Sequence, residues 1–118
     1  LVVEGQMHGS FAQGMGQALM EAIRYGNNGQ LLTAHLMDYL LPTASDMPEM
    51  ILDHFETPSI DTVGGFKGVG EGGTVAALPA IANAVADALS SVAANVSKMP
   101  LTPGYVLELI EGNEVELQ

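Results

Sequence analysis

The hydrophobic positions near the start of the chain repeat with the period of a helix. From about Met7 to Tyr25 they recur every three or four residues, which places them on one face of an α-helix. We expect this helix to end at the turn signal Gly26-Asn27-Asn28-Gly29. The stripe consists of Met7, Phe11, Met15, Leu19, Ala22 and Ile23.

Three glycines interrupt this first helix, at positions 9, 14 and 16. Each costs up to ~1 kcal/mol relative to alanine in a helix interior. Because three such costs fall within one helix, we expect another part of the molecule to approach its backbone closely.

The middle of the chain loses the helical period. Residues 30–35 and 50–55 have the pattern of short strands, whereas Pro42 makes the stretch 38–46 extended or irregular. Residues 57–73 are rich in glycine and have no period, so we predict one long ordered loop.

Two further helices are predicted in the second half. A hydrophobic stripe runs from Val75 to Leu89, and Pro79 fits best in a first helical turn, so we expect a helix over 79–91. Thr102 is a candidate N-cap, with Pro103 opening a short helix to Ile110. The fold class predicted is α+β, with two main helices packed on short strands in residues 1–110 and an acidic tail at 111–118.

Composition excludes several classes of function. The 118 residues include 3 Lys and Arg against 14 Asp and Glu, a net charge of −11, so binding to nucleic acid or to an anionic membrane is not expected. There is no cysteine, hence no disulfide and no cysteine-based zinc site. One small domain of this length is expected to bury roughly 65% of its unfolded surface.

Targeting signals are not expected either. The longest apolar stretch, 75–89, is interrupted by Asn83 and Asp87, so no membrane insertion is predicted. The first residues have no signal-peptide pattern, and a cytoplasmic protein is the default expectation. Because residue 1 is Leu rather than Met, we expect a piece of a longer protein.

Candidate chemistry gathers at Gly68-Val69-Gly70-Glu71-Gly72-Gly73, which matches G-x-G-x-x-G. A dinucleotide-binding loop is not expected, because no apolar strand precedes it. Glu71, flanked by glycines, could act as a general base if it were shielded from water, or could simply favour the positive end of the next helix. Lys67 could bind an anion, together with the amides of 68–70, or be solvated.

Several segments in order resemble the molybdenum hydroxylases, the xanthine dehydrogenase and aldehyde oxidase family. Residues 5–19 resemble its G-Q-x-x-G-x-x-x-Q-G-x-G-x-A-L segment, and residues 37–44 its D-Y-x-x-P-T segment. Residues 66–73 resemble its K-G-x-G-E loop, and residues 80–89 and 101–103 its last helices. The chain looks most like the C-terminal part of the molybdopterin-binding large subunit of bacterial carbon monoxide dehydrogenase-like enzymes.

The resemblance implies roles for individual residues. Glu71 corresponds to the catalytic base, which takes the proton from the oxygen that attacks the substrate. No protein side chain ligates the metal in this family. The residues that the resemblance places at the pterin are Gln6, Lys67, Gly68, Val69 and Gly70, with Gln13 and Gly14 as weaker candidates.

The resemblance also implies cofactors and partners. The cofactor would be a molybdenum-pterin, in the molybdopterin cytosine dinucleotide form, with iron–sulfur clusters and FAD on other subunits or domains. The partners would be the remainder of the large subunit, the iron–sulfur and flavin subunits, and a small-molecule substrate. The alternative is a non-catalytic truncated piece that serves only structure or interaction.

Overall fold

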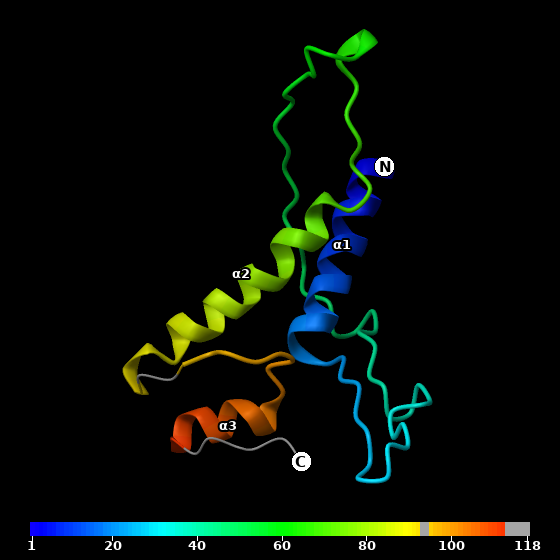
Figure 1. Cartoon of the computed structure of the whole chain (residues 1–118). Coiled ribbons are helices and arrows are strands. Elements are labelled where there is room, and N and C mark those ends of the chain that lie inside the picture. Colours follow the sequence, from blue (N-terminus) through cyan, green and yellow to red (C-terminus); the bar gives the residue numbers. More distant parts are fainter. Residues whose placement is uncertain (93–94, 113–118) are drawn as a thin grey trace.

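The computed structural model describes residues 1–92 and 95–112. Three α-helices account for most of the regular structure in this part of the chain, and two short 3₁₀ turns lie between them (Figure 1). The elements are α1 (Val2–Leu19), η1 (Val63–Gly65), α2 (Gly72–Ala88), η2 (Ser90–Val92) and α3 (Pro103–Glu111).

Helices α1 and α2 pack directly on each other, and small residues make that packing close. A Cβ atom added at Gly14 would lie 2.5 Å from the Cβ of Ala77, and one added at Gly73 would lie 2.7 Å from the Cβ of Ser10. The expected close approach to the first helix is therefore confirmed at Gly14. It is wrong at Gly9, where a Cβ would meet nothing within 4 Å.

Helix α1 begins earlier and ends earlier than its hydrophobic stripe predicts. The chain leaves the helix after Leu19, and the N–H groups of Met20 and Glu21 both donate to the carbonyl of Gly16, at 2.9 and 2.8 Å. A Cβ at Gly16 would collide with the Glu21 carboxylate and lie 2.9 Å from the ring of Pro42. The helix thus ends where Pro42 from the distant middle of the chain packs beside it, well before the predicted Gly-Asn turn.

Helix α2 starts at Gly72, seven residues before the predicted start. Pro79 therefore lies in the helix interior, not in its first turn. Proline there donates no hydrogen bond to the carbonyl of Val75, four residues earlier. Both residues are exposed, so water can reach the carbonyl, which makes the interruption tolerable.

The last helix forms as the sequence predicts. The Thr102 hydroxyl accepts a hydrogen bond from the N–H of Tyr105 at 3.3 Å, and Pro103 is the first helical residue. Gly112 ends α3 in the left-handed conformation, with φ of 73°. The predicted acidic tail lies outside the described residues from position 113 onward.

The strands of the predicted α+β fold are not confirmed. Within the described residues the only β pairing is one antiparallel bridge between Tyr25 and Leu31. Residues 30–35 and 50–55 carry strand-like patterns, but a strand needs a hydrogen-bonding neighbour, and the described chain offers them none beyond that bridge. The two main helices pack on each other rather than on strands.

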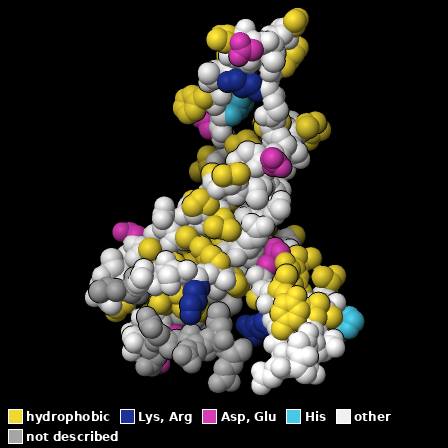
Figure 2. Space-filling view, in the orientation of Figure 1, with side chains coloured by type: hydrophobic (Ala, Val, Ile, Leu, Met, Phe, Trp, Pro, Cys, Tyr) yellow, Lys and Arg dark blue, Asp and Glu magenta, His cyan; other side chains and the backbone are white. Residues whose placement is uncertain are grey.

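Residues 51–70 project from the helices as an arm, with η1 at its tip (Figure 1). Large hydrophobic side chains on the arm are exposed, as Figure 2 illustrates. Ile51, Phe55, Ile60 and Val63 are almost fully exposed, and Phe66 is 77% exposed. No described helix is long and apolar enough to cross a membrane.

The chain buries much less surface than an independent domain of its size. Its accessible surface is 9013 Å², whereas a compact monomer of 12.3 kDa exposes about 6,100 Å². The radius of gyration is 17.9 Å, against about 13.5 Å for a compact chain of this length. The expected burial of roughly 65% is therefore wrong: about half of the unfolded surface is buried.

Candidate functional site

The structure brings Gln6 of α1 to the glycine-rich loop that precedes α2. The Nε2 atom of Gln6 donates a hydrogen bond to the carbonyl of Gly70 at 3.3 Å, across 64 positions of sequence. Only the amide nitrogen can face a carbonyl in this way, so the acceptor fixes the orientation of the Gln6 amide. Two of the predicted cofactor-binding residues therefore lie side by side at the base of the arm.

Glu71 occupies the N-cap position of α2. Its carbonyl accepts a hydrogen bond from the N–H of Thr74 at 3.1 Å, while its side chain makes no capping hydrogen bond. The carboxylate is exposed and has no hydrogen bond or ion pair to the described residues. The positive end of α2 favours a negative charge at Glu71. Two interpretations of this residue therefore stay open, a general base and a carboxylate that simply stabilises the start of the helix.

The loop before Glu71 leaves room for a ligand on its open side. Cβ atoms added at Gly68 and Gly72 would meet nothing within 4 Å, and one at Gly70 would meet only Gln6 Nε2, at 3.7 Å. The N–H groups of 68–70 have no acceptor among the described residues. Open space, unused donors and a neighbouring amide side chain fit one wall of a pocket for a polar group such as a pterin.

The other predicted site residues divide into accessible and covered positions. Lys67 and Val69 are exposed on the arm next to the loop, and Gln13 is exposed on α1, about two turns beyond Gln6. Gly14 is buried against Ala77 of α2, so it serves the helix crossing. Helix α2 occupies the space on this side of Gly14, and the weaker cofactor assignments of Gln13 and Gly14 stay predictions.

One hydrogen bond joins the D-Y-x-x-P-T segment to the chain just after α1, and two more close a turn beside it. The hydroxyl of Tyr39 donates to the carboxylate of Glu21, and this hydrogen bond, followed by burial and the negative charge, raises the pKa of Tyr39. Thr43 donates to Asp46 Oδ2 from both its N–H and its hydroxyl, each at 2.7 Å, which lowers the pKa of Asp46. This segment forms a structural support and lies outside the Gln6 site.

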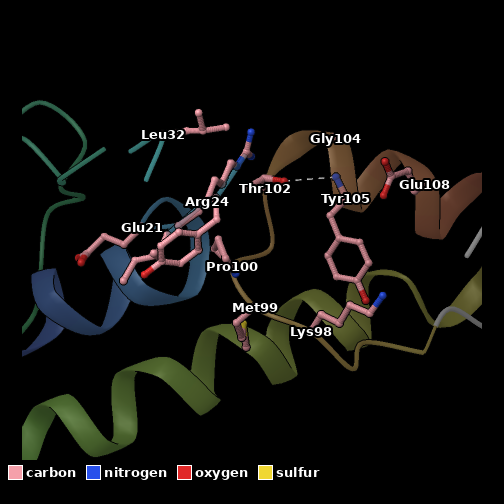
Figure 3. A pocket seen from close by; sticks show the side chains of 13 residues that line it. Glu21, Arg24, Leu32, Lys98, Met99, Pro100, Thr102, Gly104, Tyr105 and Glu108 are labelled. Carbon is pink, nitrogen blue, oxygen red and sulfur yellow. Dashed lines mark hydrogen bonds between the residues drawn. The ribbon is translucent and has the colours of Figure 1, made fainter. Parts of the chain in front are cut away.

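A cavity of about 880 Å³ lies at the opposite end of α1 and contains none of the predicted site residues. It lies between residues 21–25 and the segment 98–108, as Figure 3 shows. Leu101 fixes that segment, because its N–H donates to the carbonyl of Ala18 at 2.6 Å. Sequence reasoning missed this cavity, although Arg24 and Lys98, two of the three cations in the chain, line it.

Comparison with known proteins gives the same assignment for sequence and for fold. Residues 1–48 match the family model described as molybdopterin cofactor-binding domain. The chain is 41% identical over 111 residues to the nicotine 6-hydroxylase large subunit of Paenarthrobacter nicotinovorans. It superposes on quinoline 2-oxidoreductase from Pseudomonas putida 86 with a TM-score of 0.90 at 42% identity, over 96% of its length. The chain belongs to the molybdenum hydroxylase family.

Other family members match at similar levels. The carbon monoxide dehydrogenase large chain of Afipia carboxidovorans is 39% identical over 100 residues, and a Cu,Mo-CO dehydrogenase structure has a TM-score of 0.89. In each case the chain spans only a small part of the relative, 14% of the nicotine 6-hydroxylase subunit and 14% of the quinoline 2-oxidoreductase chain. It therefore corresponds to one segment of these large subunits.

Proposed function

We propose that this chain is part of the large subunit of a molybdenum-dependent oxidoreductase, a hydroxylase or a carbon monoxide dehydrogenase-like enzyme. It would supply the catalytic base, Glu71, and one wall of the molybdopterin pocket. The observation that carries the proposal is the hydrogen bond from Gln6 to Gly70, because it joins two family-like motifs directly beside Glu71.

The cofactor in this proposal is a molybdenum-pterin, in the cytosine dinucleotide form. When bound, it supplies the two-electron redox chemistry. Gln6 offers amide donor and acceptor atoms to it, and the open loop offers the N–H groups of 68–70. Lys67 would add a positive charge beside the loop, and Val69 would offer the cofactor an apolar contact.

Glu71 would act as a proton acceptor. Its carboxylate oxygens have no described partner, so they are available to take the proton that the attacking oxygen loses. A carboxylate is a stronger base when it is shielded from water, and Glu71 is exposed within this chain. The covering surface would therefore come from other parts of the enzyme.

The exposed surface supports assembly with other polypeptide. The chain exposes about 2,900 Å² more than a compact monomer of its mass, an area in the range of permanent interfaces. We propose that the remainder of the large subunit covers the arm and the helices, and that iron–sulfur and FAD-containing subunits complete a cytoplasmic enzyme acting on a small molecule. A second candidate, a purely structural piece, is favoured by the exposure of Glu71.

The test is Glu71→Gln in the full large subunit, purified with its partners. The change keeps the shape of the side chain and removes its basicity, so kcat should fall by ~10²–10⁴-fold while molybdenum content stays at the wild-type level. Glu49→Gln is the matched control, because Glu49 is exposed and has no described partner. Activity of Glu71→Gln above about a tenth of wild type would refute the base assignment. Absence of molybdenum from the wild-type complex would favour the structural role.

A further inference from the structure

We infer that Gln6 is a positioning residue for the loop that carries Glu71: by holding the Gly70 carbonyl, its Nε2 atom fixes the direction in which Glu71 leaves the backbone. This inference rests on the proposed role of Glu71. It differs from the role expected for Gln6 as a cofactor ligand, since the partner here is the protein's own backbone.

The loop needs such a restraint because of its composition. Two of the four loop residues from 68 to 71 are glycine, the residue with the greatest backbone freedom, and two more glycines open α2 directly after them. Apart from the hydrogen bonds within α2, the described hydrogen bonds of the loop are the one from Gln6 to the Gly70 carbonyl and the one from the Thr74 N–H to the Glu71 carbonyl. The first of these is the one that reaches another element of the fold.

Peptide geometry transmits the restraint to Glu71. The carbonyl of Gly70 and the nitrogen and Cα of Glu71 belong to one planar peptide unit. A hydrogen bond that holds the oxygen therefore limits rotation of the whole plane. The side chain of Glu71 is attached at the end of that plane, so its carboxylate inherits the orientation.

Gln6 is well placed to provide a rigid anchor. Gln6, Ser10 and Gly14 are spaced four residues apart on α1 and therefore lie on one face of the helix. Ser10 meets Gly73, and Gly14 meets Ala77. Gln6 thus continues the row of α1–α2 contacts by one turn, from the helix crossing onto the loop.

The geometry leaves Gln6 capable of a second contact. One of its two N–H groups serves Gly70, while the other N–H and Oε1 remain available. The same side chain can then touch the pterin and the loop of the base. Loss of the backbone contact should disturb proton transfer, whereas loss of the pterin contact should disturb cofactor retention.

The experiment compares Gln6→Met and Gln6→Glu with Gln17→Met in the full large subunit. Methionine keeps the length but cannot donate, and glutamate places an acceptor opposite a carbonyl. Gln17 is an exposed glutamine on the same helix with no described hydrogen bond, so its variant is the matched control. Hydrogen exchange of the peptide covering 66–74 is measured with and without cofactor, together with molybdenum content, kcat, KM and the pH profile of kcat.

A single hydrogen bond of this kind corresponds to about a two- to tenfold effect. We expect exchange in residues 68–74, including the Thr74 N–H, to accelerate by about that factor in both Gln6 variants, even without cofactor. We also expect kcat to fall by a similar factor at unchanged KM and molybdenum content, with an altered pH profile. Gln17→Met should match wild type in every measurement.

Two outcomes would overturn the inference. Wild-type exchange of the loop in Gln6→Met would show that the hydrogen bond does not restrain it. Loss of molybdenum with unchanged loop exchange would make Gln6 a cofactor ligand only. Failure of the proposed function is distinguishable, because full activity of Glu71→Gln would refute the base assignment without touching the exchange result.

Discussion

The crossing of α1 and α2 depends on the absence of a side chain at Gly14, and Gly14→Ala tests this directly. The added Cβ would lie 2.5 Å from the Cβ of Ala77 and 3.1 Å from the backbone nitrogen of Leu78. Carbon atoms in favourable contact are about 3.5–4.0 Å apart. The helices would therefore have to separate by about 1 Å at their closest point.

Two opposing effects set the magnitude. Alanine is favoured over glycine in a helix interior by up to ~1 kcal/mol. Overpacking of a close contact costs about 1–3 kcal/mol, and neither partner here is a flexible side chain that can move aside. Gly9→Ala gains the helix preference of alanine without a collision, because a Cβ atom at position 9 meets nothing within 4 Å. The difference in stability between Gly14→Ala and Gly9→Ala therefore measures the cost of the collision, about 1–3 kcal/mol.

Hydrogen exchange in α2 is a suitable assay, because a large subunit does not unfold in a single two-state step. Amides of residues 76–86 should exchange about 5- to 150-fold faster in Gly14→Ala than in Gly9→Ala. Adding Ala77→Gly to Gly14→Ala removes the colliding methyl group and should restore much of the protection. Equal or greater protection in Gly14→Ala would refute the reasoning, because it would mean that the crossing has room for a Cβ.

Two further predictions concern side-chain hydrogen bonds outside the site. Because its hydrogen bond to Glu21 raises the pKa of Tyr39 above 10.0, the folded state holds the phenol proton more tightly than the unfolded chain. The hydrogen bond stabilises the folded state fully below pH 10, and this stabilisation is lost as the pH rises through the pKa that Tyr39 has in the folded protein. The loss of thermal stability at alkaline pH should therefore be smaller in Tyr39→Phe than in wild type. An equal loss of thermal stability in both proteins would contradict the prediction. Thr102→Ala removes the cap of α3 and should lower the local stability of this helix by ~0.5–2 kcal/mol. The measurement is hydrogen exchange of the amides in the first turn of α3, which should become faster. Thr57→Ala, a substitution in an exposed loop, is the control.

Local signals predicted where a helix begins or ends only where residues of that helix and its cap supply the decisive contacts. The Thr102-Pro103 start of α3 was predicted correctly, because the capping hydroxyl and its acceptor position are three residues apart. The start of α2 was missed, because Pro79 usually marks a first turn and here lies on an exposed face inside the helix. The end of α1 was missed, and the distant residue Pro42 packs beside Gly16 at that end.

In the candidate site too, local sequence identified single residues, whereas contacts between distant segments were visible only in the structure. The glycine-rich loop and Glu71 were recognisable from sequence, and so was Gln6, through the resemblance of separate motifs. Their adjacency was not recognisable, because a hydrogen bond across 64 residues leaves no periodic signal. The strand predictions for 30–35 and 50–55 were not confirmed, because strand pairing depends on neighbours that the described chain does not provide.

The sequence by itself determined the acidic charge, the helical stripes, the capping of α3 and the family to which the chain belongs. These properties depend on residue type and on spacing within a few positions. Only the tertiary structure decided that Gly14 and Gly73 serve a helix crossing, that Gln6 holds Gly70, and that Glu71 is exposed within this chain. The physical reason is that each of these depends on which distant segment comes within a few ångströms, and that is set by packing rather than by local pattern.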